Sequence, residues 1–222
     1  MDNELIKELK RQNKFRLKNL VNQRLNILTK EGYYLSDYFL GKLDLAYLNI
    51  ILSDWDNIDK SEFNSKLKEL IETNALKIQK EISGILTKRK EVIECIFELY
   101  KSKNYIAIIP LILSQVDGIM KEITNGNAGF YMAYPEKSKQ NPNQLKYLDK
   151  ELYVNFLSEY EQLNVENRND YELFGRNISD MTKFNRHTIL HGESCEYANE
   201  LNSIKAMLLL AFITEIYRVN IK

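Results

Sequence analysis

The two histidines of this 222-residue chain lie four positions apart, directly after an arginine. On a helix, His187 and His191 would be one turn apart and share a face, and Arg186 could reach the same surface. Imidazole groups titrate close to neutral pH, whereas a guanidinium group keeps its positive charge. Groups that move protons beside a fixed cation suit phosphoryl chemistry, in which negative charge builds on phosphate oxygens.

Three other interpretations of these residues stay open. The histidine pair could be an ordinary feature of a helix surface. It could bind zinc, but zinc needs three or four ligands, and the nearby candidates, Glu193 and Cys195, follow the helix end that Gly192 predicts. Arg186 could instead be the structural ion-pair partner of an acid such as Asp180 or Glu193.

The sequence predicts that the segments carrying these residues are helical. The chain has 3 prolines and 8 glycines, and all the prolines lie between positions 110 and 142. Apolar residues recur at helical spacing elsewhere, and no convincing stretch alternates between polar and apolar residues. We therefore predict an all-α fold.

Local signals also predict where several helices begin and end. An apolar segment over residues 34–52 predicts one buried helix, in which Tyr34 serves packing rather than base stacking. Pro110 either lies in the first turn of the helix over residues 105–123 or kinks it. Side chains that favour helix starts are Asp59, Asn104 and Asn199, and glycines that favour helix ends are Gly32 and Gly192.

Charge and composition exclude some classes of protein. The 31 basic and 31 acidic residues cancel, so the chain lacks the strongly basic character of many nucleic-acid-binding proteins. The first 30 residues are nevertheless basic, either as a solvated helix face or as a phosphate-contacting arm, whereas residues 151–222 are acidic. No apolar stretch is long enough to span a membrane, and no secretory signal is recognisable, so we expect a cytoplasmic protein.

The motif region resembles the HEPN domain family. Arg186 and His191 are similar to the R-x4–6-H motif of that family, and His187 occupies the position after the arginine where HEPN proteins often carry a polar residue. The stretch 105–118 is also similar to an earlier helix of bacterial members. The resemblance covers about residues 90–222, so we predict an HEPN-like helical domain over 89–222. Residues 1–88 would form an N-terminal helical region of unknown role.

The resemblance implies a metal-independent endoribonuclease that needs no cofactor. It implies that Arg186 and His191 act together at the interface of a homodimer, with RNA as substrate. It also implies a role as a toxin or effector in prokaryotic defence, with an antitoxin or regulatory protein as a further partner. We expect that replacing either residue with alanine abolishes cleavage and leaves the fold intact. The alternative is a non-catalytic HEPN-like module that binds nucleotide, RNA or a protein.

Four further residues are candidates to support the site. His187 would orient His191, contact phosphate or pack. The resemblance suggests that the helix carrying Asp117 packs beside the motif, where its carboxylate would orient His191 or Arg186; the alternative is an exposed acid. Gln115 has the same two possibilities, and Asn185 is expected to cap the motif helix. One departure from the family concerns Glu193, which stands where some HEPN toxins carry tyrosine, so regulation by tyrosine modification is not supported.

Overall fold

The described part of the chain is built from helices. The computed structural model describes residues 28, 31–123, 184 and 186–220, and the predicted all-α class is confirmed for these residues, which contain no strand. The helices are α2 (Asp37–Leu40), α3 (Leu45–Ser53), α4 (Lys60–Ile85), α5 (Lys90–Lys101), α6 (Tyr105–Ile123), α9 (Arg186–Leu190) and α10 (Glu200–Asn220), with a 3-10 helix η1 at Thr87–Arg89. None of these helices is both long and apolar enough to cross a membrane.

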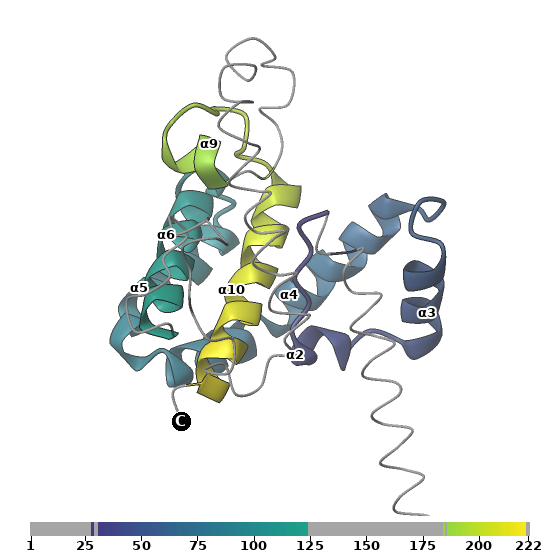
Figure 1. Ribbon diagram of the computed structural model, residues 1–222, viewed down its shortest axis with the longest axis horizontal. Coiled ribbons are helices and arrows are strands. Elements are labelled where there is room, and N and C mark those ends of the chain that lie inside the picture. The colour runs from purple at the N-terminus through teal and green to yellow at the C-terminus, as the bar shows by residue number, and fades with distance from the viewer. Residues whose placement is uncertain (1–27, 29–30, 124–183, 185, 221–222) are drawn as a thin grey trace, which may run out of the picture.

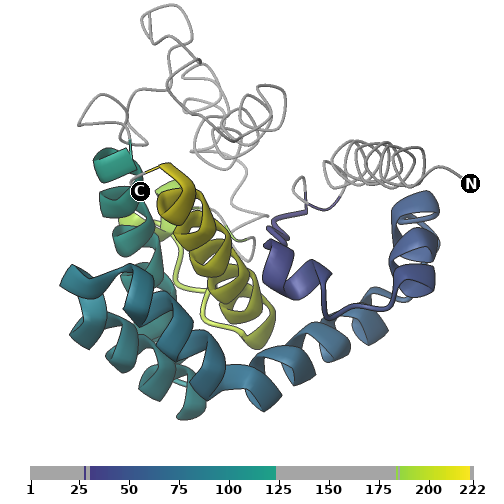
Figure 2. The same ribbon diagram turned by 90° about the horizontal axis from the view of Figure 1, so that it is seen from below.

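Helices α6 and α10 pack side by side at the centre (Figures 1 and 2). Helix α5 packs against α6, α4 packs against both α5 and α10, and the short α9 lies against α6. From the bundle, α4 leads outward to α3 (Figure 2). The buried apolar core draws residues from both sides of position 88. The division into residues 1–88 and 89–222 stays a prediction.

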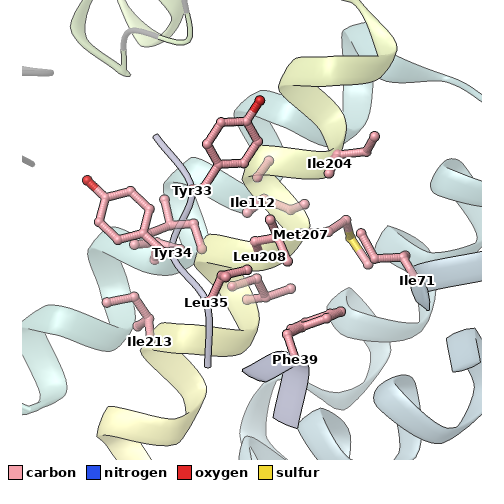
Figure 3. Packing of buried hydrophobic residues seen from close by; sticks show 14 of the residues in the cluster. Tyr33, Tyr34, Leu35, Phe39, Ile71, Ile112, Ile204, Met207, Leu208 and Ile213 are labelled. Atoms are coloured by element: carbon pink, nitrogen blue, oxygen red, sulfur yellow. The ribbon is translucent and has the colours of Figure 1, made fainter. Parts of the chain in front are cut away.

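The prediction of one buried helix over residues 34–52 is wrong. Tyr33 to Ser36 form an extended segment whose side chains are buried against the core (Figure 3). The chain then forms α2, turns at Gly41 and starts again at α3, where Asp44 Oδ1 accepts hydrogen bonds from the backbone N–H groups of Ala46 and Tyr47. Burial of this stretch followed from its apolar residues, whereas the break coincides with Gly41 and the cap at Asp44, which the apolar pattern does not show.

Three predicted helix boundaries, at Asp59, Asn199 and Gly192, are confirmed, and Gly32 has a positive φ angle, although the segment before it lies largely outside the described residues. Asp59 Oδ1 accepts a 2.8 Å hydrogen bond from the backbone N–H of Ser61 at the start of α4. Asn199 Oδ1 accepts a 2.9 Å bond from the N–H of Asn202 at the start of α10. Gly32 and Gly192 have φ angles of 84° and 74°, which a glycine adopts without the steric cost of a side chain.

Pro110 lies inside α6, and its position helps to attach the loop that follows the motif. Proline has no backbone N–H, so the carbonyl of Ile106, four residues earlier, lacks its usual partner within the helix. The hydroxyl of Tyr197 donates a 2.9 Å hydrogen bond to that carbonyl. The loop between α9 and α10 is thereby fixed to α6 at the point where the proline interrupts the ladder of hydrogen bonds.

Gly118 gives room to an arginine on the surface of α6. A Cβ atom at position 118 would lie 2.9 Å from Arg89 Nη2. The guanidinium of Arg89 crosses this glycine and donates a 2.8 Å hydrogen bond to Gln115 Oε1 and a 2.5 Å bond to Glu122 Oε1. These contacts join η1 to α6, and they depend on the missing side chain.

The variant Gly118→Ala is therefore expected to have a free energy of unfolding about 1–2 kcal/mol lower than that of a glycine-to-alanine variant in open space, because the added methyl group displaces Arg89 from two polar partners. Chemical denaturation measures this change. The matched control is Gly84→Ala, which meets no atom within 4 Å near the end of α4 and should be neutral or stabilising by up to about 1 kcal/mol. Equal stabilisation by both substitutions would contradict the role given to Gly118.

Candidate functional site

A buried ion pair fixes the start of α9 to α6. Arg186 is the first residue of α9 and is 5% exposed. Its Nη2 donates a hydrogen bond to Asp117 Oδ2 and forms an ion pair with that carboxylate, whose side chain is 16% exposed. The expectation that the Asp117 helix packs beside the motif is confirmed by this contact. Asp180, one of the two acids that the sequence offered as a partner of Arg186, lies outside the described residues.

This ion pair is largely buried. Burial lowers the pKa of Arg186 to about 10, which still leaves the guanidinium charged at neutral pH. Oδ1 of Asp117 is buried and has no hydrogen-bond partner. A buried carboxylate oxygen without a hydrogen-bond donor costs free energy. This ion pair therefore stabilises the fold less than one in which both carboxylate oxygens accept hydrogen bonds.

His191 is exposed and lies just after α9 rather than within it. The helix ends because Gly192 takes a positive φ angle and the carbonyl of Thr188 accepts hydrogen bonds from the N–H groups of Glu193 and Ser194, at 2.9 and 3.0 Å. Whether the two histidines share a face, as the sequence predicts, stays a prediction, because the side chain of His187 lies outside the described part. His187 itself belongs to α9, and the whole of Asn185 also lies outside the described part.

The sequence made both Gln115 and Asp117 candidates to support the site, but the two side chains have different partners. Two residues apart on a helix correspond to about 200° of rotation, so their side chains leave α6 in nearly opposite directions. Gln115 accepts a hydrogen bond from Arg89 instead. Nothing in the sequence indicated this role of Arg89, because the two partners are 26 positions apart.

The described residues contain no group of three or more histidine, cysteine or acidic side chains placed to hold a metal ion. Glu193 and Cys195, the two residues considered as additional ligands, are exposed in the loop after His191. What the described part brings together is an exposed imidazole after α9 and a buried, ion-paired arginine at its start.

A scan against models of protein families finds no match, a search of curated proteins finds none, and neither does a search of solved structures. The interpretation of the site therefore depends on its own geometry and on the resemblance of its motif.

Proposed function

We propose that the chain is an HEPN-type endoribonuclease that uses His191 from two copies in one composite site. The observation that carries the proposal is the placement of the two motif residues. Arg186 is buried and bound to Asp117, and so anchors α9, whereas His191 follows the other end of the helix and is exposed. An anchored helix that presents an exposed imidazole is what proton transfer to a large external substrate requires.

The reaction proposed is attack of the RNA 2′-hydroxyl on its neighbouring phosphate. The oxygen–phosphorus bond to the next nucleotide breaks, leaving a 2′,3′-cyclic phosphate and a 5′-hydroxyl. One group must remove the proton of the 2′-hydroxyl, and another must protonate the leaving oxygen on the opposite side of the phosphorus. A two-fold dimer supplies two copies of His191 from one self-complementary surface. A regulatory or antitoxin protein would act by covering that surface.

Arg186 has a modified role in this proposal. The resemblance implies that it stabilises charge on the phosphate, but at 5% exposure its guanidinium offers little surface to a phosphate group. We assign it to holding α9, and therefore His191, in place. Asp117 fixes the arginine through Oδ2, whereas its Oδ1 is buried and has no hydrogen-bond partner.

The experiment that tests the proposal is incubation of the purified protein with single-stranded RNA in the presence of EDTA. The expected products carry cyclic phosphates and 5′-hydroxyls. RNA of the same sequence with 2′-O-methyl groups is the matched control, because it lacks the attacking hydroxyl, and it should remain intact. Cleavage of the methylated RNA, or cleavage that requires added zinc, would contradict the mechanism.

A second candidate is a non-catalytic module that binds a nucleotide, RNA or a protein. The burial of Arg186 favours this candidate, because an ion pair with Asp117 is also what a purely structural clamp would form. The acidic residues within 151–222 favour it as well, since they repel a polyanion. RNA binding without any cleavage in the assay above would support it over the nuclease.

A further inference from the structure

The segment 186–197, which we call the strap, is attached to α6 at both of its ends. At its start, Arg186 forms the ion pair with Asp117. At its end, the hydroxyl of Tyr197 donates a 2.9 Å hydrogen bond to the backbone carbonyl of Ile106. The two attachment points are about 16 Å apart along the axis of α6, because each residue of a helix adds about 1.5 Å. The strap therefore has two fixed ends on a single helix.

The backbone of the strap is also held around His191. The carbonyl of Thr188 accepts a 3.0 Å hydrogen bond from the N–H of Ser194, a residue that is 2% exposed. Further along, the carbonyl of Tyr197 accepts a 3.0 Å hydrogen bond from Nδ2 of Asn202, which is 3% exposed. His191 is thus an exposed residue on a backbone that is bonded to buried residues. The position of its imidazole depends on whether both ends of the strap stay attached.

The attachment at Tyr197 depends on a proline within α6. In an uninterrupted helix, the carbonyl of Ile106 would accept a hydrogen bond from the N–H of residue 110, but Pro110 has no N–H to donate. The phenol of Tyr197 donates to this carbonyl instead. An alanine at position 110 would supply the missing N–H and would compete with Tyr197 for the same oxygen.

We propose that Tyr197 is a positioning residue for His191, because its hydrogen bond to α6 keeps the imidazole in the place where proton transfer occurs. This inference rests on the proposed function. Loss of the Tyr197 hydroxyl frees one end of the strap, whereas Arg186 keeps the other end attached. A displacement of about 1 Å at a reacting group can lower a rate by about 10²-fold, and the retained ion pair limits the expected loss to about tenfold.

The first test needs no RNA and reads the position of His191 directly. The chain has 2 histidines, so the full chain with isotope-labelled histidine gives two sets of imidazole signals in NMR spectra, and His191→Ala identifies one of them. Tyr197→Phe removes the hydroxyl and keeps the ring. We expect this variant to shift or broaden the signals of His191 and to leave those of His187, which follows the retained ion pair, unchanged.

Two further variants make this test specific. Tyr105→Phe removes a tyrosine hydroxyl that donates a 3.3 Å hydrogen bond to Glu200, outside the strap, and it should leave the His191 signals unchanged. Pro110→Ala should change them in the same direction as Tyr197→Phe, because it supplies a competing N–H, and it should add little in the double variant. Unchanged His191 signals in Tyr197→Phe, or an equal change in Tyr105→Phe, would overturn the proposal.

The second test measures RNA cleavage by the same variants. Tyr197→Phe should lower kcat about tenfold and change KM by less than about twofold, since it displaces a proton-transfer group without removing a contact to the substrate. Tyr105→Phe should cleave at the original rate. An unchanged kcat in Tyr197→Phe contradicts the positioning role. Absence of cleavage by the original chain would instead refute the proposed function, and the NMR signals would still decide whether Tyr197 fixes the imidazole.

Discussion

Replacing Asp117 with leucine is expected to lower the free energy of unfolding by about 3–5 kcal/mol, because it leaves the Arg186 guanidinium buried without this carboxylate. Leucine has as many side-chain heavy atoms as aspartate and branches at the same carbon, but it carries no charge and fills more space. We attribute most of the expected cost to the buried, unpaired charge. Chemical denaturation of the variant and the original chain measures it, and helix α9 should be the first element to lose protection from hydrogen exchange.

The double variant Asp117→Leu with Arg186→Met is the matched control. It removes both charges together, and buried ion pairs replaced by apolar residues of similar volume often regain their stability. We expect it to recover most of the loss, so the two substitutions should be strongly non-additive. Additive effects, or a cost below about 1 kcal/mol for Asp117→Leu, would show that the ion pair does not anchor α9.

Replacing His191 with alanine is expected to reduce the rate of RNA cleavage by about 10²–10⁴-fold, which is the usual contribution of a group that transfers a proton in the transition state. The free energy of unfolding of this variant should stay within about 0.5 kcal/mol of that of the original chain, because His191 is exposed and lies outside the core. Cleavage is measured with purified protein in EDTA, and stability by chemical denaturation.

Glu193→Ala is the matched control for this substitution, since Glu193 is also exposed in the turn that follows α9. It should change the cleavage rate by no more than about twofold. A chain that cleaves RNA at full rate without His191 would exclude the proposed mechanism. If Glu193→Ala lowered the rate of RNA cleavage as much as His191→Ala does, the active site would have to be assigned to the loop that follows α9.

Burial of Arg186 changes how its own variants can be interpreted. The sequence suggested that Arg186→Ala would abolish cleavage and leave the fold intact. With 5% exposure and an ion pair to Asp117, the alanine variant instead leaves a buried carboxylate and a cavity. Loss of activity in that variant would combine folding and chemistry, whereas the exposed His191 separates them.

Part of the site could be predicted. The end of the motif helix at Gly192 has a local signal, whereas the packing of the Asp117 helix beside the motif was suggested by the resemblance, and both are confirmed. The sequence did not predict that His191 lies beyond the helix, because the last turn depends on hydrogen bonds to the carbonyl of Thr188. Nor did it identify Arg89 as the partner of Gln115, which required knowing how α6 packs against η1.

The sequence by itself determined the all-α class of the described residues and the helix boundaries at Asp59, Asn199 and Gly192, because capping and positive φ angles involve only neighbouring residues. Only the tertiary structure decided which charges are buried. Arg186 and Asp117 are 69 positions apart, and nothing in either local sequence fixes their solvation. Burial and ion pairing depend on which helices pack together, and that packing makes Arg186 an anchor and leaves His191 exposed.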